Sequence, residues 1–357
     1  MLKRRTAYKN HKTAMNNAKI SKTIKVTIFI ILVLIHAASS ESGNSGLFRI
    51  GTGGQTGVYY PIGKIIAQGI TSEDSFGKPI KPGENGVPGY IGVAQLSAGS
   101  IDNVHRMANG EIEAGLVQAD VAAWAFQADH VFKGNDKARA VRAIASLYPE
   151  KFQIVTRSDA DIRNVDGLRG KHIAIDEIGS GTLAIMRIVL EAHGMSERDL
   201  LPVYLKPVFT HDKMISGEIQ GFVMMAGAPM DAISQLLSVG ISLVPISQEK
   251  ASRIEARYPY LVPGHIPSGV YPSIPQVSTI QVHALLVVNE TIDETLAYQI
   301  TAALWSQRTL SMLKEGHPQG KSITPLTAFT GVSIPLHPGA KKYYQEHPER
   351  FKGFPKE

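Results

Sequence analysis

The sequence predicts an α/β fold made of two lobes. Short apolar strands alternate with amphipathic helices at a spacing typical of βαβ units, which favours largely parallel sheets. Charged residues make up 19% and hydrophobic residues 43% of the 357 residues, as in ordinary α/β proteins. The extended segment "SLYPEKFQIVTRSD" follows the first set of units and is typical of a chain that crosses into a second lobe.

The apolar pattern assigns strands and helices in turn along the chain. The spacing of Ile62, Ile65, Ile66 and Ile70 puts one apolar stripe on the first helix, as packing on a sheet requires. The expected strands are 48–51, 92–96, 114–118, 140–146, 152–156, 172–176, 202–205, 221–225 and 243–246. The expected helices are 59–71, 101–109, 121–132, 181–192, 209–216, 229–237 and 294–314.

Two crossings define the expected lobes. With the first crossing at the extended segment and the second near "LVPISQEK", lobe 1 comprises 46–149 and 250–357, and lobe 2 comprises 150–249. The segment 258–276 is too rich in proline for a helix or a central strand and is expected to wrap the surface. The segment 76–90, with its glycines and prolines, is expected to be a loop insertion.

The first forty residues have the pattern of a secretory signal. Residues 1–40 carry eight basic residues and no acid, and they end in an apolar run, 26–35, followed by the small residues Ala38 and Ser40. Cleavage near Ser40 and export to the periplasm are expected. Since no cysteine follows the run, a lipid anchor is not expected. The alternative is an N-terminal membrane anchor with a short span, although a spanning helix needs about 20 apolar residues.

Charge and cysteine content exclude several classes of function. The net charge is +6, but without the eight basic residues of 1–40 the chain has 29 Lys and Arg against 31 Asp and Glu. A protein so close to neutrality gives no electrostatic argument for binding nucleic acid or an acidic membrane. The absence of cysteine excludes disulfides, thiolate metal sites and thiol nucleophiles.

The stretch "FRIGTGGQTGVYYPIGKIIAQGI" places glycines between a strand and a helix. The spacing of a dinucleotide fingerprint fails, because Thr56 stands where the third glycine belongs, and no Walker lysine follows. No nucleotide cofactor is therefore expected. The glycines allow close approach of a ligand, and the free N–H groups at the start of the next helix suit a carboxylate. The alternative is a tight strand–helix turn without a ligand.

Similar small and polar junctions recur at four further strand ends. They are "LSAGSIDNV", "GLVQADVA", "IDEIGSGTLA" and "VMMAGAPMDA". Three of the five junctions fall in lobe 1 and two in lobe 2. Each alone is typical of an N-cap, but ligands of open α/β sheets bind outside the carboxyl ends of strands. Together they predict a ligand held in a cleft between the lobes.

The sequence gives little support for a catalytic site or a metal site. No histidine pair has the spacing of a helical zinc site and no G-x-S-x-G elbow exists, so neither a metal nor a catalytic residue is predicted. The acidic pairs Asp159/Asp161 and Asp176/Glu177 are expected on a solvated surface. Tyr59 and Tyr60 fit either a pocket wall or the core. The segment "HPGAKKYY" is expected to form a C-terminal helix docked on lobe 1.

Several long motifs make the sequence resemble one family of transport proteins. The motifs are "IGTGGQTGVYYPIG", "GSIDNVHRMANGEIEAGLVQADVA", "RAIASLYPEKFQIVTRSDADIRNVDGLRGKHIAI", "GSGT", "GEIQGFVMMAGAP" and "IPLHPGAKKYY", in order from residue 48 to residue 344. The chain resembles the solute receptors of TRAP transporters in the TRAP-associated extracytoplasmic immunogenic (TAXI) family. The resemblance implies a type II-like periplasmic binding protein, a monomer that hands a small carboxylate or amino acid, such as glutamate, glutamine or a dicarboxylate, to a membrane permease.

The resemblance also implies a set of ligand-binding residues at the junctions. They are Thr52, Gly53, Gly54, Gly57, Tyr59, Ser100, Asn103, Gln118, Asp120, Ser180, Gly181, Thr182, Ala226, Gly227 and Pro229. The third family loop usually reads Thr-Gly-Gly-Ser-Val-Glu-Asn, whereas this chain has "LSAGSIDN", with Ser97 and Ala98 in place of the threonine and one glycine. The ligands of relatives therefore do not transfer directly.

The sequence leaves open two other functions and the identity of the basic residue that pairs with a ligand carboxylate. The alternatives are a secreted α/β enzyme that uses a carboxylate and a tyrosine as acid and base, and a periplasmic sensor or antigen that binds a partner protein and no solute. Spacing does not choose the basic residue that pairs with a ligand carboxylate among Arg49, Lys151, Arg157 and Lys206.

Overall fold

The structure is a computed structural model that describes residues 46–72 and 86–353. The chain divides into two compact units, Met1–Ser45 and Gly46–Glu357, and the fold described here is that of the second. The expected secretory signal at 1–40 and most of the expected loop 76–90 lie outside the described residues. In the described ranges, no helix has both the length and the apolar character needed to cross a bilayer.

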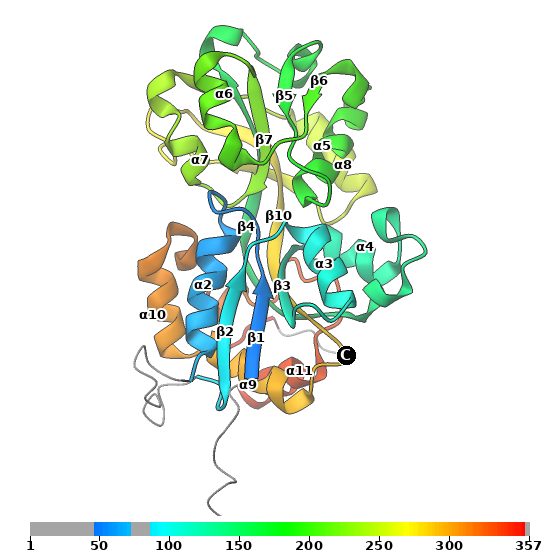
Figure 1. Ribbon diagram of the computed structural model, residues 1–357, viewed down its shortest axis with the longest axis vertical. Helices are drawn as coiled ribbons and strands as arrows, with labels where there is room; N and C mark the ends of the chain where they lie inside the picture. Colours follow the sequence, from blue (N-terminus) through cyan, green and yellow to red (C-terminus); the bar gives the residue numbers. More distant parts are fainter. Residues whose placement is uncertain (1–45, 73–85, 354–357) are drawn as a thin grey trace, which may run out of the picture. The chain divides into compact units, whose positions relative to one another are not determined.

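One mixed sheet of ten strands runs through the described unit. Its main path has the order β2-β1-β3-β10-β4-β7-β5-β6, and β8 and β9 lie off this path, paired with β4 and β10 (Figure 1). The strands are β1 (Gly46–Gly51), β2 (Tyr90–Gln95), β3 (Ala114–Gln118), β4 (Val141–Arg157), β5 (His172–Ala174), β6 (Leu201–Val203), β7 (Gly221–Ala226), β8 (Ile241–Leu243), β9 (Val262–Ile266) and β10 (Val277–Asn289).

Two long strands join the two lobes. β4 pairs with β10 over its first part and with β7 and β8 over its second part, so one strand belongs to both halves of the sheet. β1, β2 and β3 are parallel to each other in one lobe, and β5, β6 and β7 are parallel in the other. β4 and β10 run antiparallel to their neighbours. In Figure 1 both strands pass from the lower to the upper lobe. The predicted two-lobed α/β fold class is confirmed.

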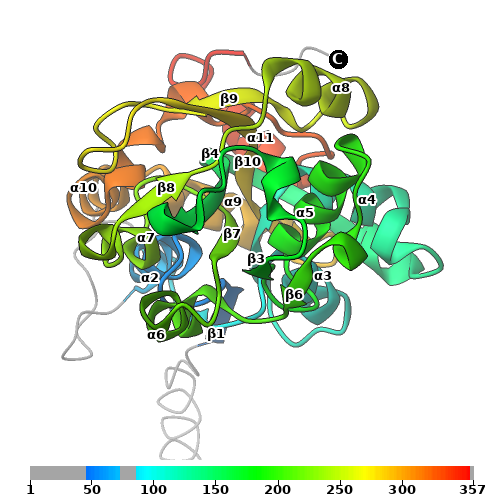
Figure 2. The ribbon, with the colours of Figure 1, turned by 90° about the horizontal axis from the view of Figure 1, so that it is seen from above.

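Helices cover both faces of the sheet, as the view in Figure 2 shows. α2 and α10 lie on one side of the lobe that contains β1 and β2, α9 lies at the base of this lobe, and α3 and α4 lie beside β3 (Figure 1). The helices are α2 (Tyr59–Ile70), α3 (Ser100–Ala108), α4 (Ala119–Gln127), α5 (Gly181–Ala192), α6 (His211–Ser216), α7 (Asp231–Ser234), α8 (Gln248–Arg257), α9 (Glu294–Leu304), α10 (Gln307–Gly316) and α11 (Pro338–Glu346).

The sheet separates two buried apolar clusters. Successive strand residues point to opposite faces, so neighbours enter different clusters. Leu116 and Leu286 pack with α2 and α9 on one face, whereas Val117 and Leu285 pack with α3, α4 and α5 on the other. Both clusters continue through residues of the two lobes, and this continuity makes the sheet the common support for every loop at the strand ends.

Several predicted elements differ from those observed. The expected strands 140–146 and 152–156 are one continuous strand, β4, and β10 was missed although "VHALLVV" is rich in β-branched and apolar residues. The segment 258–276 contains β9, which lies off the main path of the sheet, where proline is tolerated. The expected helix 294–314 is two helices, because Ser306 caps a new helix through a hydrogen bond from Thr309 N–H.

Two predicted helices are shorter than expected. The helix expected at 121–132 ends at Gln127, followed by a left-handed Ala128. The helix expected at 229–237 begins at Asp231, so Pro229 does not belong to its first turn. The predicted lobe boundaries fall inside β4 and inside α8, and they stay predictions.

Candidate functional site

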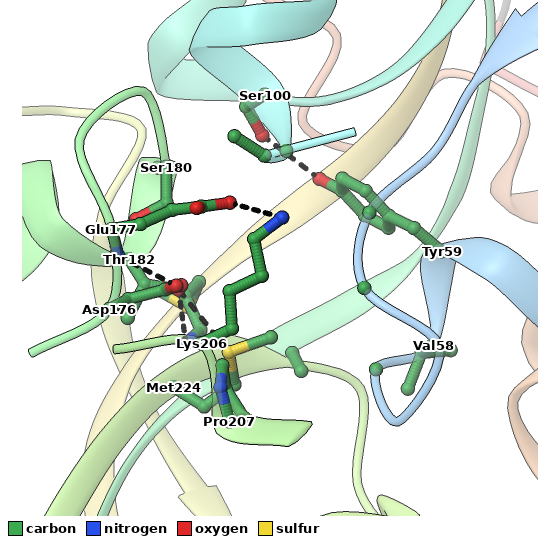
Figure 3. Close-up of a pocket in the computed structure, with 18 of the residues that line it drawn as sticks. Val58, Tyr59, Ser100, Asp176, Glu177, Ser180, Thr182, Lys206, Pro207 and Met224 are labelled. Carbon is green, nitrogen blue, oxygen red and sulfur yellow. Dashed lines mark hydrogen bonds and ion pairs between the residues drawn. The ribbon is translucent and has the colours of Figure 1, made fainter. Parts of the chain in front are cut away.

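A cavity lies where the strand-end loops of the two lobes face each other (Figure 3). It encloses about 580 Å³ of space free of atoms, including its opening to solvent. One wall consists of the loop before α2, the loop before α3 and the end of β3. The opposite wall consists of the loop after β5, the first residues of α5, the segment around Lys206 and the end of β7. Loops far apart in sequence therefore meet at one site.

The two walls touch directly. The main-chain N–H of Asp102 donates a hydrogen bond to the carbonyl oxygen of Gly179 over 3.1 Å. Gly179 has a φ of 92°, a backbone conformation that a residue with a Cβ rarely adopts. A Cβ on Gly57 would lie 3.4 Å from Cε of Met224. Such contacts between the lobes are those of a closed site.

Ten of the fifteen residues expected to bind a ligand line this cavity. They are Gly53, Gly54, Gly57, Tyr59, Ser100, Gln118, Ser180, Gly181, Thr182 and Ala226. Their common feature is a position at the end of a strand or in the first turn of the following helix. Residues of all five junctions thus come together, as the pattern of small and polar strand ends predicted.

Three of these residues form a chain of hydrogen bonds that ends on a buried acid. The main-chain N–H of Gln118 donates to Ser100 Oγ over 3.1 Å, and Ser100 Oγ lies 3.3 Å from Tyr59 Oη. The Tyr59 hydroxyl donates to Glu150 Oε2 over 3.1 Å. Glu150 lies in β4 and lines the cavity. The tyrosine therefore belongs to the wall of the pocket, and Tyr60, the other tyrosine considered, does not line it.

Thr52 and Asn103 do not reach the cavity. The Thr52 hydroxyl donates to the carbonyl oxygen of Gln95, and the Asn103 Nδ2 donates to the carbonyl oxygens of Thr52 and Leu116 over 2.7 and 2.8 Å. Both side chains are fully buried. The polar groups that were predicted to bind a ligand instead tie three strand ends together, which holds the loops of the first wall in place.

Asp120 also lies outside the lining of the cavity. It is in the first turn of α4 and fully buried, and neither carboxylate oxygen has a hydrogen-bond partner in the described part of the chain. Burial raises its pKa to about 7, and the nearby backbone N–H groups of Val121 and of Asp120 itself oppose this shift. The negative charge of Asp120 in turn raises the pKa of Glu150, so the two acids are electrostatic neighbours.

Gly227 and Pro229 support the second wall from outside. A Cβ on Gly227 would lie 2.6 Å from Cγ of Gln319 and 3.2 Å from a ring carbon of Tyr148, so the residue is packed from behind. Pro229 follows a cis peptide bond after Ala228. Gln319 Nε2 donates to the carbonyl oxygen of Ala228 over 2.5 Å, which engages the backbone of this loop outside the cavity.

Sequence reasoning missed three charged residues that line the cavity: Glu150, Asp176 and Glu177. The expectation of a solvated Asp176 was wrong, because its side chain is 5% exposed. Burial raises the pKa of Asp176 to about 6, against hydrogen bonds that include the one donated by the Glu177 N–H over 2.8 Å. The sequence carries little signal for Glu150, since Pro149 precedes it and Lys151 follows it in a segment expected to cross between the lobes.

Of the four basic residues considered for a ligand carboxylate, only Lys206 lines the cavity. Arg49 pairs with Glu113 over 2.5 Å, Lys151 donates to Gln281, and Arg157 pairs with Asp159. The Lys206 ammonium lies 2.9 Å from Glu177 Oε1. Figure 3 shows the side chain extending through the pocket, with its nitrogen on the side of Ser100 and Tyr59.

Four helices begin at this cavity. α2, α3, α4 and α5 each have nine residues or more, and residues at or just before their first turns line the space. The first N–H groups of a helix lack partners within the helix and carry partial positive charge. Together with Lys206 they favour an anionic group, whereas Glu150 and Asp176 favour a hydrogen-bond donor. In the described ranges there is no group of three or more acidic or histidine side chains that could hold a metal ion.

Solved structures with similar backbones include binding proteins. The chain is similar to a protein from Bordetella bronchiseptica RB50 (14% identity, 87% of this chain and 92% of that chain, TM-score 0.49). It is also similar to the periplasmic aliphatic sulphonate binding protein SsuA from Escherichia coli (13%, 84% and 83%, TM-score 0.42). A third is an ABC transporter periplasmic binding protein from Brucella ovis with glutathione bound (12%, 78% and 71%, TM-score 0.43). These similarities say nothing about what this chain binds.

The family comparison covers almost all of the described unit. The model of the NMT1-like family matches residues 50–347, from the end of β1 to just after α11. The match therefore includes both walls of the cavity and both strands that join the lobes. The chain belongs to the NMT1-like family.

Proposed function

We propose that this protein is an extracytoplasmic solute receptor that captures a small carboxylate or amino acid and delivers it to the membrane permease of a TRAP-type transporter. The observation that carries the proposal is the cavity between the lobes, where loops preceding four helices converge. Helix N-termini are general anion sites, and polar side chains at a cleft fix orientation. Export to the periplasm and action as a monomer are part of the same proposal.

The mechanism follows from the closed contacts. In an open state the strand-end loops of both lobes face solvent. A ligand that bridges them stabilises the closed state by the contacts it makes only there, and this difference shifts the population. β4 and β10 are the segments that connect the lobes, so residues 148–153 in the middle of β4 are the proposed hinge. The Asp102–Gly179 hydrogen bond would break on opening.

Calorimetry tests the proposal. The full-length protein is unfolded in denaturant and refolded to remove any bound ligand, and it is then titrated with amino acids, monocarboxylates and dicarboxylates. We expect one class to bind with a dissociation constant in the micromolar range or below, about −8 kcal/mol or stronger. A native mass spectrum before unfolding should show a small co-purified molecule. If nothing binds and nothing co-purifies, the receptor function is wrong.

An acid–base enzyme is the second candidate, because a hydroxyl and an acid with a shifted pKa meet in the same cavity. Tyr59 donates to Glu150 there, and burial raises the pKa values of both groups. Shifted pKa values in a cleft are common in active sites. The two functions differ in what becomes of the ligand. A receptor returns it unchanged after prolonged incubation, whereas an enzyme converts it, and NMR of the recovered ligand distinguishes the two.

The transporter class needs its own test. Vesicles that contain the membrane subunits of a TRAP transporter should take up the ligand only when this protein is present, and a sodium or proton gradient should drive the uptake. Uptake that instead requires ATP would assign the protein to another transporter class while leaving its role as a receptor intact.

A further inference from the structure

Glu150 is a buried acid that lines the cavity, and only one of its two carboxylate oxygens has a hydrogen bond. Its side chain is 1% exposed, and it lies in the middle of β4, where Val282 of β10 is its cross-strand neighbour. Oε2 accepts the hydrogen bond of Tyr59, whereas Oε1 has no hydrogen bond within residues 46–72 and 86–353. Because the residue lines the cavity, that oxygen of the ionised acid is an acceptor for which the described protein supplies no donor.

A second acceptor without a donor belongs to another residue that lines the cavity. Gln118 is 3% exposed and lines the cavity, and its Oε1 is buried with no hydrogen-bond partner in the described ranges. A buried acceptor without a donor is unfavourable, and a ligand that supplies the donor removes this cost. Two such acceptors at one cavity, on β4 and at the end of β3, indicate a ligand group that donates several hydrogen bonds.

The groups around Glu150 supply no positive charge that pairs with it. Tyr59 from α2, Asp120 from α4 and Tyr148 from β4 itself are its titratable neighbours, and none carries a positive charge. Across the cavity, Lys206 is already paired with Glu177, and Asp176 is a further acid. No lysine, arginine or histidine in the described ranges forms a salt bridge with Glu150. An ammonium group carries one positive charge and three donors and has no acceptor, which fits both requirements.

We propose that Glu150, with Gln118 beside the same cavity, recognises a protonated amine of the ligand, so that the pocket selects amine-bearing acids over carboxylic acids without an amine. The inference rests on the proposed solute-binding function and names the ligand class of the same site. The acid group of the ligand lies toward the helix N-termini and Lys206, and the amine lies toward Glu150. Dicarboxylates without an amine leave both acceptors without donors and bind weakly.

This role of Glu150 predicts that binding of an amine releases a proton, which a contact without a change in ionisation would not do. Burial, and after it the charge of Asp120, raise the pKa of Glu150 well above its usual value, which favours the protonated form in the empty site. An ammonium beside it favours the ionised form and lowers this pKa. Binding of the amine therefore releases about one proton when the pH lies between the two pKa values, and affinity falls as the pH is lowered through that range.

The test compares matched ligands and matched variants by calorimetry in two buffers of different ionisation enthalpy. The ligand pairs are L-glutamate and glutarate, L-alanine and propionate, and L-leucine and 4-methylpentanoate, each with and without the amine. The variant is Glu150→Gln, which keeps the shape and can still accept from Tyr59. Because the amide has the shape of the protonated acid, the form that the raised pKa favours, this variant should keep the thermal midpoint of unfolding of the parent protein.

The expected result has three parts. An amino acid binds the parent protein at least about tenfold more tightly than its partner without the amine, the value of one charge-assisted hydrogen bond. Its binding releases a proton. Glu150→Gln loses both the preference and the release, whereas Glu177→Gln, in the same cavity, keeps the preference for the amine.

Each other outcome contradicts a different statement. Equal binding of the acids with and without an amine would overturn the ligand class and leave the receptor function standing. A preference for amines that survives in Glu150→Gln would overturn the role of Glu150. No binding of any probe, with no small molecule in the native mass spectrum, would remove the proposed function, and this inference with it.

Discussion

The side-chain amide of Gln118 lies directly against Gly181, so that a Cβ on Gly181 would fall 2.5 Å from Gln118 Oε1. Gln118 ends β3 in one lobe, and Gly181 begins α5 in the other. The opening proposed above would break this contact. It makes the absence of a side chain at residue 181 a requirement of closure, in addition to any contact that the residue makes with a ligand.

Gly181→Ala should therefore weaken ligand binding by hindering closure. Overpacking a well-packed contact costs about 1–3 kcal/mol, and here the cost falls on the closed state alone. We expect a loss of affinity of that size with little change in the thermal midpoint of the empty protein. The control is Gly54→Ala, since Gly54 also lines the cavity but has no atom within 4 Å of an added Cβ. Equal effects of the two variants would contradict this account.

Shortening Gln118 in the same background should restore closure. Gln118→Ala removes the atoms that the new Cβ meets, so the double variant should bind more tightly than the sum of the two single effects predicts. Small-angle scattering with and without ligand measures closure directly. Additive effects would mean that residue 181 acts through the ligand and not through Gln118.

Asp120 should make the empty protein less stable as the pH rises. The folded protein keeps a proton on Asp120 up to about pH 7, whereas the unfolded chain releases it near the ordinary value of 3.8. The native state thus binds more protons in this range, so stability is lost from about pH 4 to about pH 7 and then stays low. Asp120→Asn should raise the free energy of unfolding by about 1–4 kcal/mol at pH 8 and by much less at pH 4.

Denaturant unfolding at both pH values measures this difference. The matched control is Asp161→Asn, whose side chain is 74% exposed and pairs with Arg163 at the surface. A surface pair contributes at most about 1 kcal/mol, so this variant should keep the pH dependence of the parent protein. An Asp120→Asn protein that is less stable at pH 8 would show that the carboxylate is charged and needed in the fold.

Local signals in the sequence located the strand–helix junctions well. The helix predicted at 181–192 is observed as Gly181–Ala192, and the helix predicted at 59–71 as Tyr59–Ile70. Ser180 explains the first of these, because its hydroxyl accepts from Leu183 N–H and caps the helix. Caps and glycine turns depend on neighbours in sequence, so a single chain contains enough information to place them.

The direction in which a polar group points was not predictable in the same way. Asn103 and Ser100 lie at the same junction, yet Asn103 bonds to backbone oxygens and Ser100 joins the network of Tyr59 in the cavity. Glu150 was missed for a related reason: a charged residue in a segment thought to cross between lobes gave no sign that it would become buried in a strand paired with β10. The direction of a polar side chain and the burial of a charged one depend on which strands become neighbours.

Lys206 and Glu177 should change the affinity for acid groups in opposite directions. The ammonium lies 2.9 Å from the carboxylate, and both side chains are about one-third exposed at the cavity, 35% and 28%. Lys206→Met removes a cation that a ligand carboxylate can approach and leaves Glu177 unpaired, so affinity for acid-bearing ligands should fall about ten- to a hundredfold. Glu177→Gln frees the same ammonium and should raise that affinity.

Salt should weaken binding less in Lys206→Met than in the parent protein. Calorimetry at low and at physiological salt measures both effects, and a fall in affinity in both variants would mean that the ligand needs the ion pair intact.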